Sequence, residues 1–264
     1  MLPLNMSKKL LPAYLLTFVN VLGFSILMPI LPFVVDNYGA PKWVFGLLLS
    51  LYSSFQFIGA PFLGSLSDSV GRKKILLVSQ AGTLLSWIVF VVALMLPEYQ
   101  VFGLALPLLI IAISRALDGL TGGNVSVTNA YVSDITNREE KSYIFGYLGG
   151  IAGLGMIIGP GIGGITAASP WGYLGTLFTS IVISSLTLIA IVVWLKESLP
   201  ESNRRTYIRR SLKDVIYIPG RIKKVNPAPM IKTIFTMKMI FSSMMGFYIG
   251  TMALFLIDLF DFNE

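Results

Sequence analysis

The chain of 264 residues contains no cysteine and no histidine, and only 12% of its residues are charged. An ordinary soluble domain carries roughly 25% charged residues, so this composition excludes a water-soluble globular protein. Without cysteine there is no disulfide framework, and without histidine the commonest metal ligand and general base are missing. The sequence also lacks a GxxxxGK[ST] phosphate-binding loop. We therefore expect no enzyme activity, no cofactor and no metal site.

The net charge of +7 does not indicate a nucleic-acid partner, because it is concentrated in one stretch. Nine Lys/Arg and three Asp/Glu lie between Lys196 and Met230, which leaves the rest of the chain nearly neutral. A basic patch spread over one face would be needed to bind nucleic acid.

Long uncharged runs cover most of the remaining sequence. A helix needs about 20 apolar residues to cross the roughly 30 Å hydrocarbon core of a bilayer. The runs predict seven spans: Leu10–Val35, Trp43–Ser67, Ile75–Pro97, 105–133, two within Ser142–Leu195 on either side of a turn at 169–172, and Met239–Ile257. The lipid bilayer is thus the first expected partner.

Basic residues predict the orientation of these spans, because Lys and Arg near span ends stay on the cytoplasmic side. They occur at alternate turns: Lys8 and Lys9, 72–74, Arg138 and Lys141, and 196–230. Lys42 is the only basic residue in the other loops. We predict an all-α integral membrane protein with a cytoplasmic N-terminus, the reverse of rhodopsin-like receptors and retinal proteins.

The loop after the second span reads GSLSDSVGRKK over residues 64–74. Gly64 and Gly71 permit a tight reversal, and Asp68 is placed to accept hydrogen bonds from Arg72 or a helix N-terminus. The string resembles the loop signature between the second and third helices of the major facilitator superfamily. That resemblance implies a conformational latch, and Asp134, near the inner end of the fourth span, is placed to meet Arg72. Simple solvation of Asp134 is the alternative.

Further segments narrow the resemblance to drug:proton antiporters. RALDGLTGG over 115–123 resembles the fourth-helix arginine motif, and GxxxGPxxGG over 155–164 resembles the fifth-helix antiporter motif. The stretches NVLG at 20–23, PILP at 29–32 and AYVSDIT at 130–136 are similar to bacterial tetracycline-type efflux proteins. The resemblance covers most of residues 10–200 and implies a six-helix N-terminal transporter half plus a seventh helix, in a bacterial inner membrane.

The fifth-helix motif comprises Gly155, Gly159, Pro160, Gly163 and Gly164. Three of its glycines recur every four residues, which forms a smooth helix face that another helix can approach closely. Pro160 permits a bend. In the resembled fold this face packs against the opposite half of the transporter, so we expect it to be exposed in this chain. A packing ridge without chemistry is the alternative for each glycine.

Arg115 and Asp118 are the ionisable residues that lie well inside a predicted span. A charge at mid-bilayer costs a few kcal/mol or more unless it is paired or hydrated. At i, i+3 spacing the two share a helix face and can neutralise each other. The two residues are candidates for proton coupling, with Asp118 carrying the proton and Arg115 tuning it. The alternative is a permanent bridge that only holds the bundle together.

Asn20 and Gln56 are polar residues in otherwise apolar spans, so both are expected to face the bundle interior. They are candidates for the substrate cavity, and interhelical hydrogen bonds explain them equally well. The resembled proteins often have an acid where Asn20 stands, so a proton carrier in the first helix is not predicted.

The chain is expected to have three parts: residues 1–195 as a six-helix transporter half, 196–230 as a basic cytoplasmic linker, and 231–264 as the first helix of a second half. Ile208, Leu212, Val215 and Ile216 at helical spacing predict an amphipathic surface helix within the linker. A solvated linker is the alternative.

The resemblance implies export of amphipathic small molecules by proton antiport with alternating access. A complete member has two six-helix halves with the substrate between them, so this chain is expected to need a missing C-terminal half or a partner subunit. The alternatives are a facilitator or sugar uniporter of the same fold, and a non-transporting membrane scaffold or half-transporter.

Overall fold

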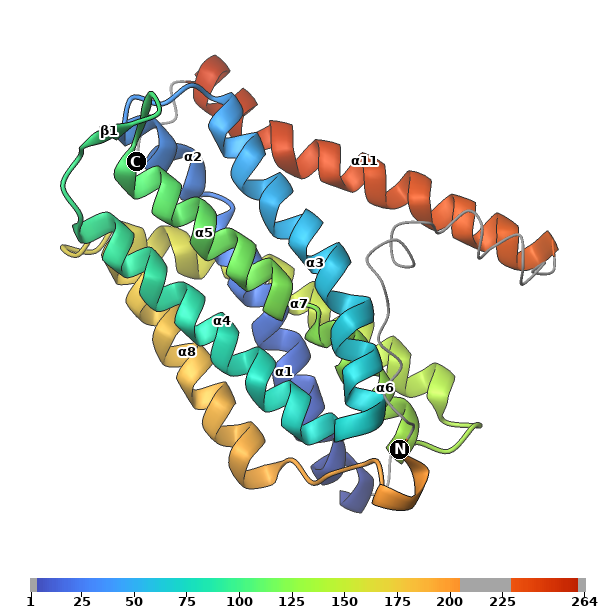
Figure 1. The fold of residues 1–264 in the computed structure, drawn as a ribbon. Helices are drawn as coiled ribbons and strands as arrows, with labels where there is room; N and C mark the ends of the chain where they lie inside the picture. Colours follow the sequence, from blue (N-terminus) through green and yellow to red (C-terminus); the bar gives the residue numbers. More distant parts are fainter. Residues whose placement is uncertain (1–3, 205–228, 261–264) are drawn as a thin grey trace. The chain divides into compact units, whose positions relative to one another are not determined.

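The structure, a computed structural model, describes residues 4–204 and 229–260, and most of them are helical (Figure 1). The elements are α1 (Leu4–Leu27), α2 (Leu31–Asn37), α3 (Trp43–Val70), α4 (Arg72–Met95), β1 (Gln100–Val101), β2 (Leu104–Ala105), α5 (Leu106–Thr121), α6 (Asn124–Ile135), α7 (Lys141–Ala167), α8 (Tyr173–Trp194), the 3₁₀ turn η1 (Glu201–Asn203) and α11 (Pro229–Phe260). The strands β1 and β2 form a short antiparallel hairpin between α4 and α5.

Within the described residues, six segments are long and apolar enough to cross a membrane. They are Leu10–Asn37, Trp43–Val70, Arg72–Met95, Leu106–Ile135, Lys141–Ala167 and Tyr173–Trp194. Their bounds match the first six predicted spans within a few residues, and the turn predicted at 169–172 separates α7 from α8. The all-α membrane fold is confirmed.

The first and fourth spans each consist of two helices, which the sequence reasoning did not predict. Span one breaks between α1 and α2, where Pro29 cannot donate a backbone hydrogen bond and Pro32 lies in the first turn of α2. Span four breaks at Gly122 and Gly123, between α5 and α6. The Gln56 side chain, on α3, donates to the Gly122 carbonyl at 3.2 Å, so the break has a polar partner inside the bundle.

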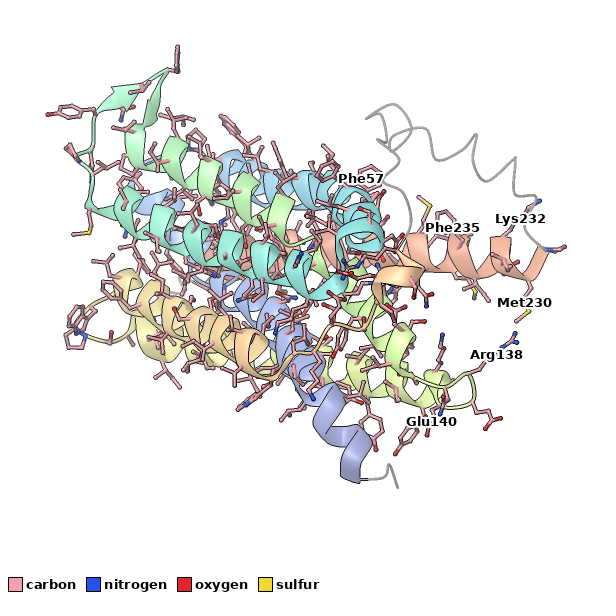
Figure 2. The ribbon with its side chains drawn as sticks, turned by 60° about the horizontal axis from the view of Figure 1, so that its bottom comes forward. Phe57, Arg138, Glu140, Met230, Lys232 and Phe235 are labelled. Carbon is pink, nitrogen blue, oxygen red and sulfur yellow. The ribbon has the colours of Figure 1, made fainter. Side chains whose placement is uncertain are left out.

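The predicted cytoplasmic segments gather at one end of the bundle (Figure 1). The start of α1, the turn from α3 to α4, the loop from α6 to α7 and η1 all lie there. Figure 2 shows Arg138 and Glu140 on the loop that joins α6 to α7. The turns that carry the basic residues therefore lie at the same end of this unit, as their alternation along the sequence predicts.

Helix pairs inside the bundle approach closely where one of them presents a glycine. α1 packs along α7, and α5 packs against both α3 and α4. Gly59 on α3 lies against the backbone of Leu120, and Gly119 on α5 lies against the backbone of Tyr52. Close packing of the backbones stabilises these helix pairs, because the hydrophobic effect does not drive helices together in lipid.

The expectation of an exposed glycine face on α7 is wrong. Gly155, Gly159 and Gly163 are buried against α1 of the same bundle. Gly163 faces the Ile26 carbonyl, Gly159 faces Ser25, and the Ser25 hydroxyl donates to the Gly155 carbonyl at 2.9 Å. Repetition every four residues indicates a smooth face but not which helix covers it. The remaining motif residues, Pro160 and Gly164, are exposed.

The chain divides into two compact units, residues 1–208 and 209–264. The predicted seventh apolar run, Met239–Ile257, lies inside α11. The predicted amphipathic surface helix around Ile208, Leu212, Val215 and Ile216 falls outside the described residues. The expected boundaries at 195 and 230 stay predictions.

Candidate functional site

A cavity of about 250 Å³ lies inside the six-span bundle. Residues from α1, α3, α4, α5, α6, α7 and α8 line it, so every crossing contributes to its wall. Asn20, Gln56 and Asp118 all lie on this wall. The structure therefore brings together three polar candidates that the sequence places in three different spans.

Asp118 and Arg115 form a buried ion pair. The Arg115 Nη1 atom lies 3.3 Å from the Asp118 Oδ2 atom, and their side chains are only 5% and 8% exposed. The Arg115 guanidinium also lies over two aromatic rings, with Cζ 5.1 Å from the Trp87 ring centroid and 5.3 Å from that of Phe90. A single long contact to the carboxylate is weaker than a bidentate pair. The aromatic rings therefore stabilise the cation in addition to the carboxylate.

The two amide side chains on the cavity wall hold the bundle together. Asn20 on α1 and Asn124 at the start of α6 exchange amide hydrogen bonds of 2.9 and 3.2 Å. Gln56 donates to the Tyr52 hydroxyl at 3.1 Å, besides its bond to Gly122. Both candidates thus make the interhelical hydrogen bonds that the sequence left open. A polar substrate that binds them must replace these partners.

The predicted latch residues meet at the end of the bundle that is predicted to be cytoplasmic. Arg72 reaches Asp68 through Nη1 at 2.6 Å and Asp134 through Nε at 3.0 Å, and its Nη1 donates to the Ser67 hydroxyl at 2.6 Å. The Ser67 hydroxyl in turn donates to the Gly64 carbonyl at 2.7 Å. Arg72 is itself buried, so one guanidinium ties the end of α3 to the end of α6.

Gly71 permits the reversal between α3 and α4. Its φ of +112° is a backbone angle that residues with a side chain rarely adopt, and an added Cβ would also collide with Glu197. At Gly64, by contrast, an added Cβ would make only ordinary contacts with Ser126. The two glycines of the loop therefore have different structural roles.

A family model described as Major Facilitator Superfamily matches residues 13–263. The chain belongs to the major facilitator superfamily. With the six apolar helices, membership makes it a multi-pass membrane protein of a transporter family and not an enzyme.

Curated relatives in this superfamily are bacterial resistance proteins, in agreement with the expected inner membrane. The class H tetracycline resistance protein of Pasteurella multocida is 34% identical over 61% of this chain and 38% of its own length. The class B protein of Escherichia coli is 31% identical over 74% of this chain and 45% of its own length. The quinolone resistance protein NorA of Staphylococcus aureus is 30% identical, with coverages of 70% and 46%. The chain thus spans less than half the length of these relatives.

A solved structure has the same fold. The crystal structure of the human organic anion transporter MFSD10 (TETRAN) matches with a TM-score of 0.66 and 23% identity. The match covers 81% of this chain and 53% of that one.

Glu197 is a site residue that sequence reasoning missed. Its carboxylate accepts the backbone amides of Arg72 at 2.8 Å and Lys73 at 3.2 Å, which are the first two residues of α4. An anion is stabilised there by the free amides and the helix dipole. The neighbouring Ser198 hydroxyl donates to Asp134 at 3.2 Å. The segment after α8 thus joins the predicted latch residues, although the sequence reasoning treated it only as the start of the basic linker.

Glu197→Ala is expected to lower the stability of the bundle by about 1 kcal/mol, because two α4 amides lose their acceptor. Thermal unfolding in detergent measures the change. Glu201→Ala is the matched control, since the Glu201 side chain is 89% exposed and, within the described residues, its carboxylate pairs with Arg204 at 3.2 Å. A surface pair contributes little. Equal unfolding temperatures for the two variants would contradict the capping role.

Asp68→Asn is expected to slow turnover of the full-length transporter with little effect on substrate affinity, because Asp68 and Arg72 form a 2.6 Å ion pair and neither of them lines the cavity. Initial rates of export over a range of substrate concentrations separate the two quantities. Asp36→Asn, at an exposed carboxylate of α2, is the control. A large affinity loss with normal turnover would argue against a latch.

Proposed function

We propose that this chain is the N-terminal portion of a transporter that exports amphipathic small molecules in exchange for protons, by alternating access. The observation that carries the proposal is the buried Arg115 and Asp118 pair, whose carboxylate borders the internal cavity. The names of the relatives, tetracycline resistance and quinolone resistance proteins, support drugs as the substrate class.

Asp118 carries the proton in this mechanism. An unpaired charge inside a membrane protein is costly, so Asp118 is either ionised beside Arg115 or neutral with a bound proton. The single 3.3 Å contact can be given up when a proton binds, because Trp87 and Phe90 still hold the guanidinium. Proton and cationic or zwitterionic substrate then compete for one carboxylate, which couples their opposite movements.

Asn20 and Gln56 orient the substrate. Each lines the cavity and presents an amide whose present partner is another polar group of the bundle. An exchange of partners keeps every buried amide hydrogen-bonded in both states, which avoids the cost of leaving a buried polar group unpaired.

The latch and the second half provide alternating access. In this proposal Arg72, Asp68 and Asp134 hold the cytoplasmic end in one of two arrangements, and a C-terminal half, in the same chain or in a partner subunit, closes the cavity from the other side.

Transport by the full-length protein in proteoliposomes tests the proposal. With tetracycline as the probe, an imposed pH gradient should drive its accumulation against its own gradient, and collapsing the pH gradient with nigericin should stop accumulation. Equilibration without a pH gradient and no accumulation with one would instead indicate a facilitator or uniporter. No flux of tetracycline or of a quinolone would favour a non-transporting scaffold.

A further inference from the structure

A second, much smaller cavity borders the same ion pair. Its volume is about 10 Å³, and it lies where α1 breaks, between that break, α3 and α5. Arg115 lines this small cavity, whereas Asp118 lines the large one. Phe24 and Tyr52 line both, and their stacked rings have centroids 5.2 Å apart. The two rings thus border both cavities. The ion pair has Arg115 in the wall of the small cavity and Asp118 in the wall of the large one.

Arg115 has a hydrogen-bond donor with no acceptor. Its Nη1 contacts Asp118, and its Nη2 donates to the Ser114 hydroxyl at 3.3 Å. Among the described residues, its Nε is one of the few buried side-chain atoms that has no partner. The residue as a whole is 4% exposed. A buried donor left unsatisfied costs about 1–3 kcal/mol, and more when the group is charged.

The break in α1 supplies an acceptor beside the same cavity. The Met28 amide donates to the Ser25 carbonyl at 3.3 Å, so the backbone turns more tightly here than an α-helix does. Phe24 lies in the last turn of α1, and a carbonyl oxygen can accept two hydrogen bonds. Phe24 and Met28 both line the small cavity. A buried donor without a partner and a carbonyl that can accept a further hydrogen bond therefore belong to residues that line one small space.

We propose that the small cavity binds one water molecule, which accepts a hydrogen bond from Arg115 Nε and donates one to the Phe24 carbonyl. A single water needs roughly 10–15 Å³ of such volume and two or more polar partners, and larger ligands do not fit. Most of the other lining side chains are leucines, which form no hydrogen bonds, and the Tyr52 hydroxyl already accepts a hydrogen bond from Gln56. The water fixes the plane of the guanidinium, so that Nη1 points toward Asp118 and the large cavity.

Radiolytic footprinting in ¹⁸O-labelled water tests this site in the full-length transporter in lipid nanodiscs. Under oxygen-free conditions, hydroxyl radicals form where water is bound, and the buried side chains beside it gain ¹⁸O from that water. Leu27 and Leu31 line only the small cavity and are 4% and 1% exposed. Leu16, on α1, is 0% exposed and lines neither cavity, whereas Leu22 lines the large one. Using leucine throughout cancels differences in intrinsic reactivity.

We expect Leu27 and Leu31 to be labelled severalfold faster than Leu16. Arg115→Lys keeps the positive charge but removes the guanidinium Nε donor, and it should lower labelling of Leu27 and Leu31 to the rate of Leu16. Leu16 should stay protected and labelling of Leu22 should stay unchanged in the variant, which shows that the bundle remains folded. Equal rates for Leu27, Leu31 and Leu16 in the wild type would overturn the proposal, and so would unchanged labelling in Arg115→Lys. Because no transport is measured, the result is independent of the proposed antiport.

Discussion

Asp118→Asn is expected to abolish pH-driven export by the full-length transporter, because asparagine keeps the shape of the side chain but cannot exchange a proton. The substitution leaves Arg115 without its anion, and breaking a buried ion pair by removing one partner costs about 3–5 kcal/mol. Stacking of the guanidinium on Trp87 and Phe90 offsets part of this loss. We therefore expect a folded protein with a lower unfolding temperature. Uptake of tetracycline into inside-out vesicles under an imposed pH gradient measures the effect.

Two further variants separate the loss of proton exchange from a loss of folding. Arg115→Gln combined with Asp118→Asn removes both charges, which should restore stability but not proton-driven export. Asp134→Asn also removes a carboxylate, but one that contacts Arg72 at the cytoplasmic end, so coupling should survive. Unchanged pH-driven export by Asp118→Asn would leave the ion pair with only the structural role that the sequence left open.

Gly163→Ala is expected to destabilise the bundle by about 1–3 kcal/mol, the range for overpacking of a close contact. An added Cβ at this position would meet the Ile26 carbonyl, which belongs to the backbone of α1 and cannot rotate away. The helices would have to separate along the face formed by Gly155, Gly159 and Gly163. The unfolding temperature in detergent and the yield of folded protein report the change.

The adjacent glycine provides a matched control. Gly164→Ala makes the same chemical change one residue along α7, where an added Cβ meets nothing within 4 Å. It should be neutral or slightly stabilising, because alanine favours helix. Similar unfolding temperatures for Gly163→Ala and Gly164→Ala would show that the packing of α1 on α7 is looser than the structure indicates.

Features that depend on nearby residues were predictable from the sequence. Span positions follow from uncharged runs, and the Arg115 and Asp118 pair follows from i, i+3 spacing. The breaks at Pro29 and at Gly122 were visible as residue types. They were not predicted as breaks, because proline and glycine are tolerated inside membrane helices when neighbours satisfy the backbone.

Apart from the contact of Arg72 with Asp134, features that depend on distant residues were not predicted. Asn124 bonds Asn20 across 104 positions, and Glu197 bonds the Arg72 amide across 125. The residues that flank Asn124 and Glu197 in the sequence do not indicate that these two side chains bind distant partners and are not simply solvated. The covering of the α7 glycines by α1 is of the same kind, because periodicity defines a face without defining its partner.

Loss of the Asp118 proton when substrate binds is the central claim, and difference infrared spectroscopy measures it most directly. Addition of tetracycline to the full-length wild-type transporter should change the intensity of a protonated-carboxyl C=O band. The account predicts that this change is absent in Asp118→Asn and retained in Asp134→Asn. A carboxyl band that responds to substrate with equal intensity in Asp118→Asn would contradict the account and assign the coupling to another acid.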